Sequence, residues 1–138
     1  MAKQSGLGDY VAVDDSGGSA RDISNDISSY TINTPQNMYE ITGIDKSAVE
    51  RLVGISDFTL SLNGYFNSAS NLSHDVFKVR TGTRTVTIAI GGNTSGKPKL
   101  EAEMLVNEYN VERGDDGALT WTASLSLQSG TAAAWSTV

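Results

Sequence analysis

The chain of 138 residues has no cysteine, a single histidine and no long apolar run. Without cysteine it can form no disulfide, no thiolate metal site and no cysteine nucleophile, which is typical of a reducing compartment. Residues 1–9 are polar and no apolar run of about 18 residues follows, so we expect neither a secretion signal nor membrane insertion. The sequons at Asn71 and Asn93 are then expected to be chance matches.

Basic residues are also scarce. Ten Lys and Arg residues oppose 16 Asp and Glu residues, which leaves a net charge of −6. This sign does not suit a protein that must bind phosphates tightly. The length suits one domain that buries roughly 68% of its unfolded surface. We therefore predict one domain over residues 1–138, with a flexible N-terminal arm at about 1–9 and a flexible tail at about 128–138.

Residues 91–98 have the spacing of a phosphate-binding loop but lack two of the features that such a loop requires. The spacing of glycine, four residues and Gly-Lys is present, but Pro98 stands where Ser or Thr would ligate magnesium. The residues that follow alternate as a strand does, whereas the motif must open a helix. The segment is better interpreted as a hairpin loop.

The other chemical motifs are also incomplete. Ser73, His74 and Asp75 are adjacent, whereas a catalytic triad gathers residues from separate elements, so Ser73 is interpreted as the cap of a short helix. The acidic pairs at 14–15 and 115–116 lack the twelve-residue pattern of a calcium loop and are interpreted as solvated turns. We therefore expect no enzyme, no cofactor and no metal.

Alternation of apolar and polar residues is the main structural signal. It predicts long strands at 58–63, 85–90, 100–111 and 119–127, with a bend near Leu105, and shorter strands near 9–13 and 38–42. Residues 23–30 have helical spacing as well, but the run at 28–32 favours a strand. There is no βαβ rhythm. We predict a mainly-β fold with minor α+β character, an antiparallel β-sandwich or barrel with a short flanking α-helix.

That flanking helix is predicted at residues 46–53. Asp45 can cap its start, Gly54 can end it, and residues 48, 49, 52 and 53 form an apolar stripe too short to be stable unless it docks. The next strand offers an apolar face. The predicted core and helix-packing residues are Leu52, Val53, Phe58, Leu60, Leu62 and Trp121.

Several segments resemble the major tail tube proteins of long-tailed, non-contractile (siphovirus-type) bacteriophages. They are residues 30–33, Pro35, residues 40–43, the predicted helix and residues 54–66, and the likeness extends from about Asp9 to Trp121. The resemblance implies a β-sandwich or barrel whose copies form rings, commonly hexameric, stacked into a hollow tube that conducts double-stranded DNA. It also implies tape measure, tail tip and terminator proteins as partners, and a place in the virion tail after synthesis in the host cytoplasm.

In such a tube, polar strand faces would line the lumen, and an acidic balance would let DNA pass without tight binding. An ordinary solvent-exposed face is the alternative interpretation. The candidate lumen-lining residues are Thr59, Ser61, Thr87, Glu101, Glu103, Thr120 and Thr122.

Contacts between subunits are expected from the termini and from the loops at 14–26 and 91–98, with Asp9, Asp14, Asp15, Asn93, Lys97 and Trp135 as candidates. A second hypothesis is a small, non-enzymatic module that binds a ligand or carbohydrate. That module would need a concave apolar site with exposed aromatic residues.

Overall fold

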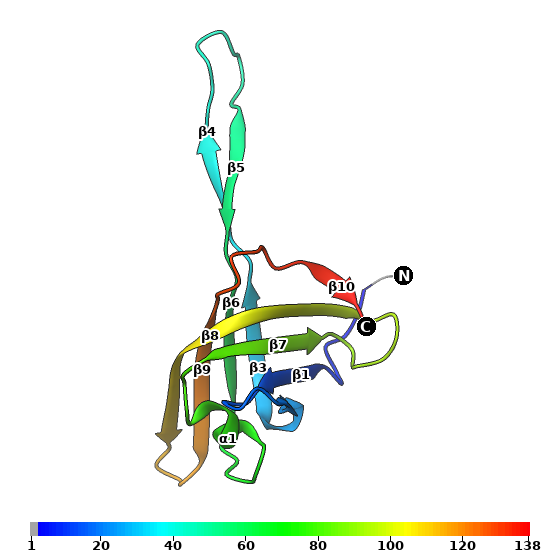
Figure 1. Ribbon diagram of the computed structural model, residues 1–138, viewed down its shortest axis with the longest axis vertical. Helices are drawn as coiled ribbons and strands as arrows, with labels where there is room; N and C mark the ends of the chain where they lie inside the picture. The colour runs from blue at the N-terminus through cyan, green and yellow to red at the C-terminus, as the bar shows by residue number, and fades with distance from the viewer. Residues whose placement is uncertain (1–2) are drawn as a thin grey trace.

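A computed structural model describes residues 3–138, which are built mainly from antiparallel strands (Figure 1). This confirms the predicted mainly-β class. None of the helices in the described residues is long and apolar enough to cross a membrane. In chain order the elements are β1 (Tyr10–Asp14), β2 (Ala20–Asp22), η1 (Ser24–Asp26), β3 (Ile27–Asn33), β4 (Gln36–Glu40), β5 (Arg51–Ser56), β6 (Thr59–Tyr65), α1 (Ser73–Phe77), β7 (Thr83–Ala89), β8 (Pro98–Arg113), β9 (Leu119–Leu127) and β10 (Trp135–Thr137).

One sheet has the strand order β2-β1-β7-β8-β9-β6-β3, and β10 also pairs with β8. The 16-residue strand β8 belongs to two halves of this sheet. Its first part pairs with β7 and its second part with β9, and a register shift separates Val106 from Glu108. The bend expected near Leu105 lies beside this bulge, since an extra residue bends a strand and increases its twist.

The two halves of the sheet cross each other in Figure 1. We call β2, β1, β7, β10 and the first part of β8 the β7 half, and the second part of β8 with β9, β6 and β3 the β6 half. A bent strand that passes from one half to the other is a known way to make such a corner. The apolar faces of both halves then enclose one core.

The core is built from alternate residues of the long strands. Phe58 precedes β6, Leu60 and Leu62 lie within it, and Trp121 lies on β9; all four are buried. Burying a large apolar side chain stabilises a fold by about 1.5–3 kcal/mol. The indole N–H of Trp121 donates to the Tyr65 carbonyl at 2.9 Å, so its polar atom is satisfied inside the core.

The prediction of a helix at residues 46–53 is wrong. Residues 51–56 form β5, which among residues 3–138 pairs only with β4, in a hairpin that projects from the body of the molecule (Figure 1). Leu52 and Val53 are 56% and 55% exposed, so neither belongs to the core. A helix this short is not stable unless it docks, and the chain instead pairs Leu52 with Tyr39 and Val53 with Met38 across the hairpin.

Gly54 also has another role than ending a helix. A Cβ atom placed there would lie 2.3 Å from Cε2 of Tyr39, so the Tyr39 ring rests directly against the glycine backbone. We call residues 36–56 the arm hairpin.

The helix expected near Ser73 is present as α1, but Ser73 does not cap it. Leu72 occupies the N-cap position and makes no side-chain capping bond. The buried carboxylate of Asp26 instead accepts hydrogen bonds from the Ser73 N–H at 3.1 Å and from Nδ2 of Asn67 at 2.9 Å. A residue distant in sequence therefore satisfies the start of the helix, which only the tertiary fold could arrange.

Replacing Gly64 with Ala is expected to lower the free energy of unfolding by about 2 kcal/mol. Gly64 lies in β6 beside the register shift of β3, and an added Cβ would lie 1.9 Å from the Asp26 carbonyl oxygen. The backbone of β3 would have to move. Urea denaturation followed by the fluorescence of the two tryptophans, of which Trp121 is buried, measures the change, with the exposed Ser61→Ala of the same strand as control. Equal stability of Gly64→Ala and wild type would contradict the expectation.

Candidate functional site

The outer side of the β6 half carries a continuous polar surface. Register pairs align Thr31, Ser61, Ser124 and Glu108 in one row across four strands. The next row contains Ser29, Asn63, Thr122 and Asn110. We call this surface the hydroxyl–amide face; its polar residues are Ser29, Thr31, Asn33, Thr59, Ser61, Asn63, Asn107, Glu108, Asn110, Glu112, Thr120, Thr122, Ser124 and Ser126. The exposed Tyr65, opposite Thr120, and Leu105, opposite Ser126, lie at its two ends.

Side chains of this face bond to one another across the strands. Nδ2 of Asn63 donates to Oγ of Ser29 at 3.2 Å, and Nδ2 of Asn107 donates to Oγ of Ser126 at 2.6 Å. The only charged members of the face are Glu108 and Glu112, and no Lys or Arg is among them. The face is thus mainly short neutral polar groups with two carboxylates, and it has no cation that could hold a phosphate.

The predicted lumen-lining residues separate into two groups. Thr59, Ser61, Thr120 and Thr122 lie together on the hydroxyl–amide face. The remaining three, Thr87, Glu101 and Glu103, lie on the β7 half, where Oγ1 of Thr87 donates to Oε2 of Glu101 at 3.0 Å and Oγ1 of Thr85 donates to Glu103. The two groups therefore lie on different halves of the bent sheet.

Sequence reasoning missed Glu108 and Glu112 as members of the face. Before the bulge, the polar residues of β8 alternate at 101 and 103; after it, they alternate at 108, 110 and 112. One inserted residue changes the phase of the alternation. The change from odd-numbered to even-numbered polar positions is the sequence signal from which the bulge, and with it Glu108 and Glu112, could have been predicted.

Both end strands of the β6 half have an open edge. Among the described residues, β3 pairs only with β6, and the part of β8 beyond Leu105 pairs only with β9. Because every neighbouring pair is antiparallel, β3 and β8 also run in opposite directions. Open edges present unpaired N–H and C=O groups and readily pair with another chain.

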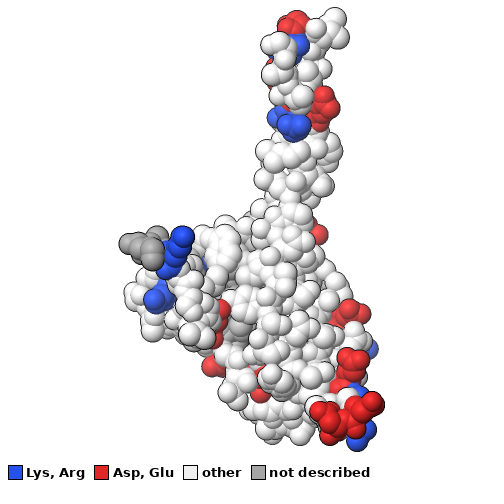
Figure 2. All heavy atoms as spheres, turned by 180° about the vertical axis from the view of Figure 1, so that it is seen from behind, with Lys and Arg blue, Asp and Glu red and all other residues white. Residues whose placement is uncertain are grey.

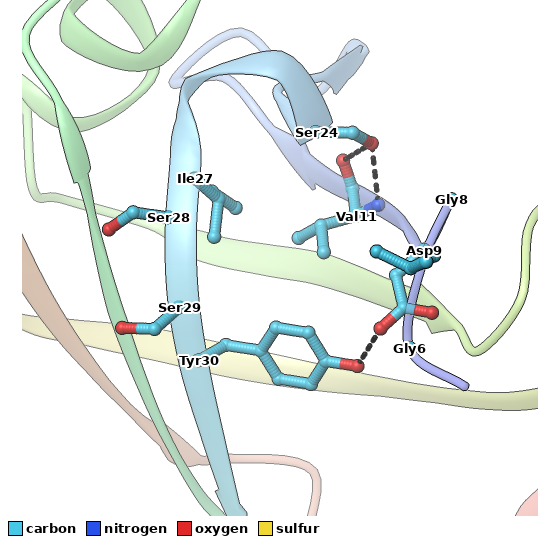
Figure 3. Close-up of a pocket in the computed structure, with 10 residues that line it drawn as sticks. Gly6, Gly8, Asp9, Val11, Ser24, Ile27, Ser28, Ser29 and Tyr30 are labelled. Carbon is cyan, nitrogen blue, oxygen red and sulfur yellow. Dashed lines mark hydrogen bonds between the residues drawn. The ribbon is translucent and has the colours of Figure 1, made fainter. Parts of the chain in front are cut away.

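The candidate contact residue Asp9 ties the N-terminal segment to two other parts of the chain (Figure 3). Its Oδ2 accepts the Tyr30 O–H at 2.5 Å, and its Oδ1 accepts the Gly91 N–H at 2.7 Å. Burial, the hydrogen bond to Asp9 and the charge of Asp9 all raise the pKa of Tyr30. The Tyr30 hydroxyl therefore stays protonated and donates throughout the neutral range.

The other candidate contact residues lie in two regions. Asp14 and Asp15 are at the end of β1, where Oδ2 of Asp15 accepts from Nε of Arg21 at 3.0 Å. The Ser19 N–H and the Arg21 guanidinium lower the pKa of Asp15. Asn93 and Lys97 lie in the β7–β8 loop, and Trp135 begins β10 on the edge of β8.

The termini lie beside the β7–β8 loop. The Gly96 N–H donates to the Val138 carbonyl at 3.1 Å, and Nε2 of Gln4 donates to the Ile90 carbonyl at 2.9 Å. Residues 135–137 of the predicted flexible tail form β10, while residues 1–2 of the predicted arm lie outside the described residues.

The three-residue run around His74 does not assemble a triad. The Ser73 side chain is buried, and Asp75 pairs with Nζ of Lys78 at 2.6 Å. Nδ1 of His74 lies 3.1 Å from the Tyr109 hydroxyl, and its ring lies 4.9 Å from that of Phe66. Residues 91–97 connect two strands rather than opening a helix, so neither motif finds the structural context that its chemistry requires.

The arm hairpin exposes many apolar side chains to solvent. Figure 2 shows charged atoms at its tip and partway along it, with uncharged atoms between them and the body. An isolated two-stranded hairpin is at best marginally stable in water, and a large exposed apolar patch marks a surface that contacts a partner. Its exposed apolar residues are Met38, Tyr39, Ile41, Ile44, Val49, Leu52, Val53 and Ile55.

No protein-family model and no curated protein sequence matches the chain. Solved structures do. The chain is similar to a subunit in the tail of an empty GTA particle with C6 symmetry, at 13% identity over 99% of both chains and a TM-score of 0.73. It is similar to the SPP1 tail tube protein at 9% identity over 99% of this chain and 80% of that chain, also with a TM-score of 0.73.

A third similar structure comes from the baseplate of the anti-feeding prophage, at 16% identity over 100% of this chain and 97% of that chain, with a TM-score of 0.61. The fold is therefore that of phage-type tail proteins. More particularly, it is the fold seen in the SPP1 tail tube and the GTA tail, which confirms at the level of fold the resemblance found in the sequence.

Proposed function

We propose that the protein is a structural subunit that assembles into stacked rings and forms the hollow tail tube through which double-stranded DNA passes. The observation that carries the proposal is the hydroxyl–amide face, which has no cation and is bounded by two open strand edges. The full-length likeness of fold to subunits of assembled tails supports it.

Ring closure follows from the directions of the edge strands. Copies related by rotation about an axis roughly along these strands keep their strand directions. The β3 edge of one copy would then meet the β8 edge of the next in antiparallel orientation, which continues the pattern of the sheet. This is a heterologous contact that closes into a ring, and the C6 symmetry of the similar GTA tail supports six copies.

In that ring the hydroxyl–amide face lines the lumen. Glu108 and Glu112 would place negative charge on the wall, and the field of that charge extends about 10 Å at 0.1 M salt. DNA would be weakly repelled and surrounded by water, so it could slide without release of bound counterions. This matches the overall charge of −6.

Stacking of rings is assigned to the arm hairpin, which projects from one end of the body (Figure 1). Its apolar residues would be buried against the next ring. The termini and the loop at 91–98 are further contacts in this proposal. Tape measure, tail tip and terminator proteins would be the other partners, and the subunit would reside in the host cytoplasm before it joins the virion tail.

Negative-stain microscopy of concentrated purified protein tests the proposal. Hollow rods or rings of uniform diameter are the expected result, because the open edges and the apolar arm hairpin favour self-association. Protein that stays monomeric at every concentration and salt condition would contradict it.

Cysteine labelling can locate the lumen, because the natural chain has no cysteine. We expect Ser61→Cys to react with a bulky polymer-linked maleimide in the monomer and to be protected at least tenfold in the assembled tube. Ser61 is exposed on the hydroxyl–amide face. Thr87→Cys, on the β7 half, is the matched comparison and is expected to be less protected. Equal labelling of Ser61→Cys in monomer and tube would place this face outside the lumen.

A further inference from the structure

A groove separates β3 from the N-terminal segment. Its volume is about 490 Å³; Gly6, Leu7 and Asp9 line one side and Ile27 and Tyr30 the other. In Figure 3 the Tyr30 side chain spans from β3 to Asp9. No strand among residues 3–138 pairs with this edge of β3, so the groove runs along unpaired backbone.

The N-terminal segment is fastened at both ends and unpacked between them. Gln4 is held at the Ile90 carbonyl, and Asp9 is held by Tyr30 and Gly91. Leu7 lies between these anchors and lines the groove, yet it is 86% exposed. A fastened segment therefore holds an apolar side chain over the groove, and residues 3–138 leave most of that side chain uncovered.

We propose that residues 4–9 form a clamp that holds a second copy of the chain against β3. The proposal rests on the proposed tube function. The occupant is the open edge of β8, residues 106–113, of the neighbouring copy. That edge is the other end of the same sheet, it runs antiparallel to β3, and it carries the half-exposed Val111 on which Leu7 could pack.

The hydrogen bond from Tyr30 to Asp9 holds the N-terminal segment beside β3 and keeps the groove open for this strand. The β8 strand of the neighbouring copy would form backbone hydrogen bonds with β3. Leu7 of the clamp would then cover the side of that β8 strand on which Val111 lies. Because the segment is already fastened in the subunit, little of its conformational freedom is lost when the neighbour binds. The clamp thus favours ring closure by pre-organisation.

Two variants test the clamp through the critical concentration for assembly, measured by sedimentation of tubes. Leu7→Ser removes only the exposed apolar contact and is expected to raise this concentration about fivefold or more. Tyr30→Phe removes only the hydroxyl and is expected to do the same, with faster hydrogen exchange of the Gly91 amide in the monomer. Val79→Ser and Tyr10→Phe are the matched controls and should leave both quantities unchanged.

An unchanged or lower critical concentration for either variant overturns the clamp, and so does unchanged Gly91 exchange in Tyr30→Phe. Failure of the wild type to form rings or tubes contradicts the proposed function itself. Wild-type tubes with unaltered variants contradict the clamp alone.

Discussion

Replacing Leu52 and Val53 with Ser is expected to abolish tube formation while the monomer remains folded. Both side chains are more than half exposed on the arm hairpin, so the isolated subunit loses no core packing. In the proposed tube each would be buried against the next ring, where a large apolar side chain contributes about 1.5–3 kcal/mol. Two such losses in every subunit would raise the critical concentration by more than about a hundredfold.

Electron microscopy and sedimentation measure the loss of tubes, and urea denaturation measures the stability of the monomer. The matched control is Glu40→Gln with Arg51→Gln, a cross-strand pair of the same hairpin, because it changes charge and leaves apolar area intact. Normal tubes from the serine variant would show that the arm hairpin does not carry the stacking contact. A serine variant that unfolds would show that the hairpin stabilises the subunit itself.

Replacing Arg84 with Met is expected to lower the free energy of unfolding by about 3 kcal/mol. Arg84 is 1% exposed, and its Nη1 donates to the carbonyls of Asp14 at 3.0 Å and Val76 at 2.7 Å. Its Nη2 donates to the carbonyls of Val79 and, at 3.2 Å, Thr81. Met fills most of the volume, but four carbonyls lose a charged donor, and the link from β1 to the end of α1 is lost.

Burial lowers the pKa of Arg84, and the nearby charges of Asp15 and Asp14 oppose that effect. The guanidinium therefore stays charged at neutral pH, and the predicted loss should not vary between pH 6 and pH 9. The control is Arg113→Met, at an exposed position before the β8–β9 turn, for which a change within about 0.5 kcal/mol is expected. Equal destabilisation by both substitutions would mean that the buried carbonyl contacts contribute nothing.

Much of the β architecture was predictable because alternation is a local signal. β6 and β9 each place an apolar residue at every second position, and a two-residue period requires one buried and one exposed face. The end of β3 is similarly local, since Pro35 follows two residues after Asn33.

The arm hairpin was not predictable in the same way. Residues 45–54 contain a helix cap, an apolar pair spacing and a terminal glycine, and these signals suit a helix as long as a surface is present for docking. In the structure the segment projects from the body instead of lying on it (Figure 1). Cross-strand pairing with β4 then satisfies the backbone, and the apolar side chains remain exposed.

The sequence by itself determined the fold class, the alternating strands and the hydroxyl and amide residues of one face, because side-chain period and composition depend on near neighbours. Only the tertiary structure decided which polar residues share that face. Glu101 and Glu103 lie before the bulge in β8, opposite β7, whereas the bulge changes the phase of the strand so that Glu108, opposite Ser124, joins the hydroxyl–amide face. A single inserted residue changes the strand's direction, and its effect on distant residues emerges only when the sheet closes around its core.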